Sequence, residues 1–300
     1  MAPSSPRDKL TERAREADSV QRRRLMRRRR LTSGIGWALC GTALALLCIS
    51  IVWILGLVLV RGIAALRPSL FTTITQGTGG GLLNAIEGTA VMALGTLLLV
   101  VPFGISAGIY VAEFPSSRWA KIIRFLADVL VGLPSIVLGY FGYVTMVEGL
   151  GWQFSVAAAS ITLAIIALPY VSRATEVALG EVPQELREAA YAMGAGAGTV
   201  TLRISMRVAL PAVITGVMLA LSVSVGETAP LLYTAGWSNY TWNGQLTHSP
   251  IGYLTYVIWA FINEPFASAH ALAYAAAFLV TTFVLLISIA SRLILIRRPR

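Results

Sequence analysis

The sequence predicts an all-α integral membrane protein with six membrane-spanning helices. Of its 300 residues, 56% are hydrophobic and only 13% are charged, whereas soluble chains carry about 25% charged residues. The apolar residues form long uninterrupted runs, and the basic residues lie in every second segment between these runs. These observations exclude a soluble domain of this length.

Six apolar runs reach the length of about 20 residues that a helix needs to cross the hydrocarbon core. They span residues 34–60, 86–111, 125–147, 154–172, 208–228 and 267–291. The first run has 27 residues and no charge, whereas the apolar part of a cleavable signal peptide has about 7–15. We therefore expect it to remain as an anchor. Pro102 is expected to kink the second run, and Pro134 lies inside the third.

The distribution of Lys and Arg predicts the orientation. If the N-terminus is cytoplasmic, the cytoplasmic segments are residues 1–33, 112–124, 173–207 and 292–300, and they hold 22 of the 24 Lys and Arg. Basic residues are retained on the cytoplasmic side of membrane proteins. Both termini are therefore expected in the cytoplasm.

The same pattern gives the predicted organisation of the chain. The expected parts are a basic cytoplasmic tail (1–33), a first span (34–60), an outer loop (61–85), a core of five spans (86–292) and a cytoplasmic C-terminus (293–300). The core contains a cytoplasmic loop at 173–207 and an outer segment at 229–266. The tail lacks apolar periodicity, which predicts disorder or a short basic helix on anionic lipid.

One segment of the cytoplasmic loop has the pattern of a short amphipathic helix. Pro183 suits a first helical turn, and Gly194 is expected to end the helix. Leu186, Ala189, Ala190 and Met193 fall on one face at helical spacing. A helix of two turns is marginal alone, so its small-residue face is expected to bind a partner. The alternative is an amphipathic linker between two spans.

This segment carries a resemblance to a known family. Glu188-Ala189-Ala190, followed by Gly194 and then Ile204, resembles the EAA signature of the permease subunits of ABC importers. The resemblance implies that Glu188, Ala189, Ala190 and Gly194 belong to a coupling helix that contacts a separate ATPase. The chain departs from the family at Met206-Arg207, where Leu-Pro is common, and this puts the geometry after the loop in doubt.

Further motifs resemble one branch of that family, the PstA-type permeases of bacterial phosphate importers. The motifs are GGLLNAIEGT at 80–89, IYVAEF at 109–114, LPYVSRATE at 168–176 and GETAPLL at 226–232. This resemblance implies a multi-pass protein of the bacterial inner membrane that transports inorganic phosphate. It also implies four kinds of partner: a PstB-like ATPase dimer, a homologous PstC-like permease, an extracytoplasmic PstS-like phosphate-binding protein and membrane lipid.

The GETAPLL stretch contains the candidate pathway or gate residues Glu227, Thr228 and Pro230. A carboxylate at the end of a span usually serves a pathway or an ion pair. Glu227 could accept a hydrogen bond from a protonated phosphate oxygen, pair with a basic residue, or bond only to nearby backbone. Arg173 is a fourth candidate; it could pair with Glu176 at i+3 or serve as a positive-inside anchor.

The chain is not expected to be an enzyme. The glycine-rich segment 77–81 lacks the GxxxxGK[ST] pattern of a P-loop, so ATP and Mg are expected on partner subunits, with no cofactor, catalytic residue or metal site in this chain. Alternatives that remain are a permease for another oxyanion or polar nutrient, a secondary transporter or channel that works without ATP, and a membrane scaffold.

Overall fold

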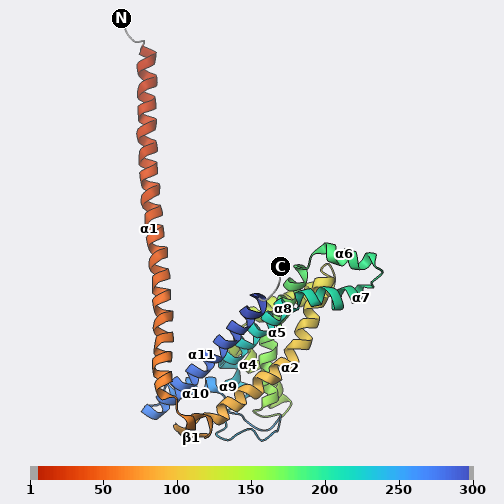
Figure 1. The fold of residues 1–300 in the computed structure, drawn as a ribbon. Helices are drawn as coiled ribbons and strands as arrows, with labels where there is room; N and C mark the ends of the chain where they lie inside the picture. Colours follow the sequence, from red (N-terminus) through yellow and green to blue (C-terminus); the bar gives the residue numbers. More distant parts are fainter. Residues whose placement is uncertain (1–5, 297–300) are drawn as a thin grey trace. The chain divides into compact units, whose positions relative to one another are not determined.

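A computed structural model describes residues 6–296 of the chain, with side chains described for residues 33–293. The chain divides into two units, residues 1–57 and residues 58–300. Within the described residues the first unit is helical throughout, and the second is a bundle of long helices with shorter elements at both of its ends (Figure 1).

Helix α1 runs without a break over Pro6–Ala65. Its residues 33–65 are long and apolar enough to cross a membrane, in agreement with the first predicted span. Residues 6–33, for which disorder or a short basic helix was expected, are helical. This segment contains no glycine and ten arginines. Arginine is a strong helix former, so the local preference of the segment agrees with the helix.

The second unit contains the remaining candidate spans. Among the described residues, five helices could cross a membrane by length and composition, and one bent pair of helices makes a sixth candidate. The long helices of the second unit are α2 (Leu83–Glu113), α5 (Val156–Gly180), α8 (Met206–Gly226) and α11 (Ala267–Ile296). They confirm four more predicted spans, although α5 continues eight residues past its predicted end at 172.

The third predicted span is broken into two arms. Residues 118–149 form α3 (Arg118–Gly132), α4 (Ser135–Gly142) and the π-helical segment η2 (Tyr143–Gly149), with a bend of 103° between the two arms. The bend lies at Leu133 and Pro134, which are both extended, with ψ near 135° and 132°. Proline disfavours a helical conformation in the residue before it, so the helix ends at this point.

Helices α2 and α5 pack closely along their length and form the centre of the bundle. A Cβ atom on Gly104 would lie 2.8 Å from Cβ of Val171, and one on Gly108 would lie 2.6 Å from the carbonyl oxygen of Ser172. Only glycine permits this approach. Pro102 lies inside α2 without ending it. The two helices therefore behave as one packed layer on which the others rest.

Short elements connect the spans at the end of the unit opposite the loop between α5 and α8 (Figure 1). They are the 3₁₀ turn η1 (Pro68–Phe71), the antiparallel hairpin β1 (Thr75–Gln76) and β2 (Gly79–Gly80), α9 (Ala229–Thr234) and α10 (Leu254–Phe261). The glycine-rich segment 77–81 thus belongs to a hairpin. Gly77 and Gly80 have φ of +55° and +81°, which glycine adopts readily.

Buried Asn84 joins this hairpin to the segment before α10. Its side-chain oxygen accepts hydrogen bonds from the backbone N–H and the hydroxyl of Thr75, both at 3.0 Å, and its side-chain nitrogen donates to the carbonyl of Ser238 at 2.8 Å. Trp237 stacks on Tyr256 with ring centroids 4.4 Å apart. The predicted outer segment 229–266 is therefore structured by α9, α10 and these contacts.

Candidate functional site

The loop between α5 and α8 presents helix α6 (Gln184–Ala192) at the end of the second unit (Figure 1). The predicted helix is present, and none of its residues is buried. Ala189 is exposed, Leu186 is 39% exposed, and Met193, which follows the helix, is 88% exposed. Leu186, Ala189 and Met193 of the predicted face are therefore exposed, whereas Ala190 is half-buried.

Gly194 ends this helix by its backbone conformation. Its φ is +81°, and its N–H donates to the carbonyl of Tyr191 at 2.9 Å, while the N–H of Ala195 donates to the carbonyl of Ala190 at 3.1 Å. Left-handed glycines with such bonds commonly close helix C-termini. A Cβ atom at Gly194 would meet no atom within 4 Å, so the position requires glycine for its conformation and not for lack of space.

Arg187 attaches α6 to the bundle. Its guanidinium donates to Oε1 of Glu113 at 2.8 Å and to the carbonyl oxygen of Leu179 at 2.9 Å. The side chains of Arg187 and Glu113 are 22% and 17% exposed. Sequence reasoning missed this contact because Glu113 lies 74 residues away. The one available signal was the position of Glu113 at the end of a span, within the motif at 109–114.

The chain returns to the bundle through α7 (Ala197–Thr199) and the π-helical segment η3 (Val200–Ser205), which continue directly into α8. Ile204 of the signature lies in η3, and Met206 begins α8. The departure at Met206-Arg207 therefore does not interrupt the helix. Pro211 lies inside α8.

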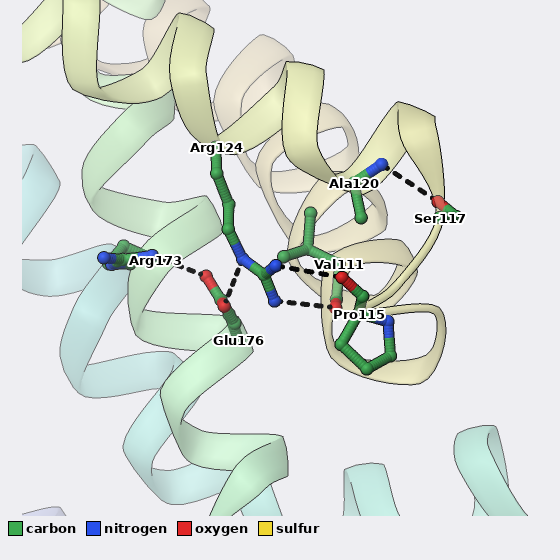
Figure 2. Close-up of polar contacts among 7 residues, drawn as sticks. All are labelled: Val111, Pro115, Ser117, Ala120, Arg124, Arg173 and Glu176. Carbon is green, nitrogen blue, oxygen red and sulfur yellow. Dashed lines mark hydrogen bonds and ion pairs between the residues drawn. The ribbon is translucent and has the colours of Figure 1, made fainter.

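Arg173 belongs to an ion-pair cluster between α3 and α5 (Figure 2). Nη1 of Arg173 lies 3.0 Å from Oε2 of Glu176, which confirms the predicted i+3 pair, and Nε of Arg124 lies 2.9 Å from Oε1 of the same carboxylate. Arg124 also donates to the carbonyl oxygens of Pro115 and Val111, at 3.2 Å and 3.4 Å. Sequence reasoning did not identify Arg124, which lies 52 residues from Glu176.

The candidate residues Glu227, Thr228 and Pro230 lie at the break between α8 and α9. Glu227 follows the last residue of α8 in an extended conformation, and Thr228 precedes α9. The carbonyl oxygen of Glu227 accepts a hydrogen bond from the hydroxyl of Thr255 at 2.8 Å. The half-buried carboxylate of Glu227 makes no hydrogen bond or ion pair with another residue in the described part of the chain.

The structure brings these three residues together but places Arg173 elsewhere. A Cβ atom on Gly216 of α8 would lie 2.2 Å from Cβ of Ala174, so Arg173 is level with Gly216. Glu227 is eleven residues further along the chain, which corresponds to about 16 Å at 1.5 Å per residue. Arg173 and Glu227 therefore belong to two separate sites.

No metal centre accompanies these sites in the part of the chain that the structure describes, where no group of three His, Cys, Asp or Glu residues is placed to hold a metal ion. The arrangement instead offers an exposed helix at one end, a cluster of charges between α3 and α5, and, at the end of α8, a carboxylate without a partner among the described residues.

The sequence matches a known protein family over most of the second unit. Residues 102–298 match the family described as "Binding-protein-dependent transport system inner membrane component". The chain belongs to this family of importer permeases. The family consists of transport permeases and not of enzymes, and the apolar spans of the second unit agree with an inner membrane component.

Named relatives of the permease cover nearly its whole length. A Mycobacterium bovis protein named "Phosphate transport system permease protein PstA 2" is 45% identical over 278 residues, which are 93% of this chain and 92% of the relative. A Yersinia pestis protein named "Phosphate transport system permease protein PstA" is 40% identical over 252 residues, which are 83% of this chain and 84% of the relative.

A solved structure has the same fold. A chain of the MetNI methionine ABC transporter in an inward-facing conformation superposes with a TM-score of 0.58, at 19% sequence identity, and covers 73% of this permease and 96% of that chain. The likeness is of fold alone.

Proposed function

We propose that this permease is a membrane subunit of an ATP-driven importer of inorganic phosphate and forms half of its translocation pathway. The observation that supports this most directly is the 45% identity to a phosphate transport permease along 92% of that relative's length. Relatedness of this extent supports a shared substrate class.

The proposed partners follow from the family. A PstB-like ATPase dimer binds ATP and Mg, a homologous PstC-like permease completes the pathway, and a PstS-like binding protein delivers phosphate from outside. The permease itself has no P-loop sequence, so we place nucleotide hydrolysis in the ATPase. Both termini and α6 are assigned to the cytoplasm of a bacterium because 22 of the 24 Lys and Arg fall in the segments on that side.

Within this complex α6 is the proposed coupling helix, with Glu188, Ala189, Ala190 and Gly194 at the contact with the ATPase. Its exposure supports the assignment, since a nine-residue helix without a buried residue is only marginally stable on its own. When ATP draws the ATPase subunits together, α6 moves and the spans rearrange.

The proposed pathway residues are Glu227, Thr228 and Pro230 at the outer half of the spans and Arg173 toward the cytoplasmic side. An unpaired, half-buried carboxylate is costly, so we assign the partner of Glu227 to the substrate or to the second permease. Glu227 can accept a hydrogen bond from a protonated phosphate oxygen. Arg173 lies beside the Arg124–Glu176 pair, where a basic group can attract a leaving anion.

The test is uptake by the complete complex reconstituted in lipid vesicles with all four components. Radiolabelled inorganic phosphate is expected to accumulate only with ATP, and excess unlabelled phosphate is expected to compete far better than sulfate or a phosphonate. Stronger competition by sulfate or a phosphonate would assign the permease to another oxyanion. Phosphate uptake that depends on neither ATP nor the binding protein would contradict the proposal.

A further inference from the structure

The last residue of α2 is an acidic one, Glu113. A negative charge at a helix C-terminus is unfavourable because the helix dipole is negative there. Glu113 also lies mostly buried, with its side chain 17% exposed. A carboxylate in such a position needs a cationic partner, and Arg187 of α6 supplies it at 2.8 Å.

The same guanidinium contacts a second helix end. Its other terminal nitrogen donates to the carbonyl oxygen of Leu179, one residue before the end of α5, at 2.9 Å. Carbonyl groups at helix C-termini lack partners within the helix, and an arginine there also interacts favourably with the dipole. Arg187 therefore joins α6 to the ends of α2 and α5 through one planar guanidinium group. Lysine could not replace it, because an ammonium group lacks this fixed fork of donors.

The helices that Arg187 holds are the most closely packed pair of the bundle. At Gly104 and Gly108 the two helices approach so closely that an added Cβ atom would clash with Val171 and Thr175 of α5. We therefore expect a displacement at the end of one helix to be shared by the other. Of these two helices, only α5 is linked to α6 by a short stretch of chain, residues 181–183. The ion pair gives α6 a direct connection to α2.

We propose that Arg187 is a positioning residue for transport: with Glu113 it passes movement of α6 to α2, so that the span pair moves as one when the ATPase moves the coupling helix. This inference rests on the proposed function and adds to it the side chain that carries the connection. Helix α6 has no buried residue of its own, so loss of the pair leaves it attached mainly through the chain.

A double-mutant cycle in the reconstituted complex tests the proposal. The variants are Arg187→Ala, Glu113→Ala and the two combined, and the measured quantity is radiolabelled inorganic phosphate taken up per ATP hydrolysed. Each single variant is expected to hydrolyse ATP but to lower this ratio at least about fivefold, the low end of typical coupling between sites. The combined variant is expected to be no worse than the more severe single variant, since both single variants break the same ion pair.

Arg118→Ala is the matched control. Arg118 is an exposed arginine at the start of α3 that makes no ion pair with the residues described in the structure, and its removal is expected to leave the ratio unchanged. A wild-type ratio in Arg187→Ala, or losses that multiply in the combined variant, would overturn the proposal.

If the single variants fail to assemble, a variant with the charges exchanged, Arg187→Glu with Glu113→Arg, tests the same ion pair. Assembly and part of the uptake are then expected to return, and their absence in the reversed pair would contradict the inference. Failure of the proposed function has a different signature, because the unmodified complex would then show no ATP-dependent uptake of phosphate at all.

Discussion

Gly139 of α4 lies directly against Pro230 of α9: a Cβ atom on Gly139 would be 2.4 Å from Cα of Pro230 and 3.0 Å from its carbonyl oxygen. The second arm of the broken third span is thereby packed on the break that carries Glu227 and Thr228. The position of that break depends on a glycine from a distant part of the chain.

Replacement of Gly139 by alanine is expected to push the two helices apart. Overpacking of this kind costs about 1–3 kcal/mol, so the purified complex should unfold at a lower temperature and take up less phosphate. Gly132→Ala is the control, because a Cβ there meets no atom within 4 Å. Equal unfolding temperatures for the two variants would show that the contact is not tight in the protein.

Gly194→Leu is expected to uncouple transport. Leucine disfavours the φ of +81° found there, by about 1–2 kcal/mol, so the end of α6 changes its path and the docking surface is displaced. Gly194→Asn should be far milder, since asparagine tolerates this conformation. The measurements are phosphate uptake and ATP hydrolysis stimulated by the loaded binding protein. Wild-type values for both in the leucine variant would disprove the coupling role of this loop.

Glu227→Gln is expected to reduce phosphate uptake while the complex still assembles. The substitution keeps the size of the side chain and removes the charge that has no partner within the described residues. Uptake and assembly, followed by size-exclusion chromatography, should be compared with Glu264→Gln, a partly buried glutamate after α10. If Glu227→Gln prevents assembly, the residue is structural and its assignment to the pathway is wrong.

Arg124→Ala is expected to loosen α3 from α5. The variant loses an ion pair to Glu176 and two hydrogen bonds to carbonyl groups near the end of α2. The Arg124 and Glu176 side chains are 31% and 18% exposed, so solvent screens the pair in part, and we expect a loss of about 1–2 kcal/mol. Thermal unfolding of the complex measures this loss. Lys121→Ala, an exposed neighbour on α3, should unfold like the unmodified protein.

Much of the fold could be predicted because membrane spans have strong local signals. Five of the six predicted spans are continuous helices, and the helix that ends at Gly194 was also expected, since glycine at its end and small residues on one face are read within ten residues of sequence. The bend at Leu133 and Pro134 was missed although Pro134 was noted. A proline inside a span can be tolerated, as Pro102 is in α2, and sequence alone does not tell which proline ends a helix.

The candidate sites were predicted only where their contacts are local. The Arg173–Glu176 pair follows from i+3 spacing within one helix. Arg187–Glu113 and Arg124–Glu176 join residues 74 and 52 positions apart, and such partners become neighbours only when the bundle packs. For the same reason the separation of Arg173 from Glu227 could not be predicted. The sequence does not indicate how α5 and α8 are shifted along each other.

The most direct test of the account is the source of energy for phosphate uptake. Vesicles that hold the complete complex should be given radiolabelled phosphate with ATP inside, with a non-hydrolysable ATP analogue, or with an imposed proton or sodium gradient and no ATP. Phosphate is expected to accumulate with ATP and not with the analogue or the gradients. Accumulation driven by a gradient in vesicles that contain this permease without the ATPase would contradict it.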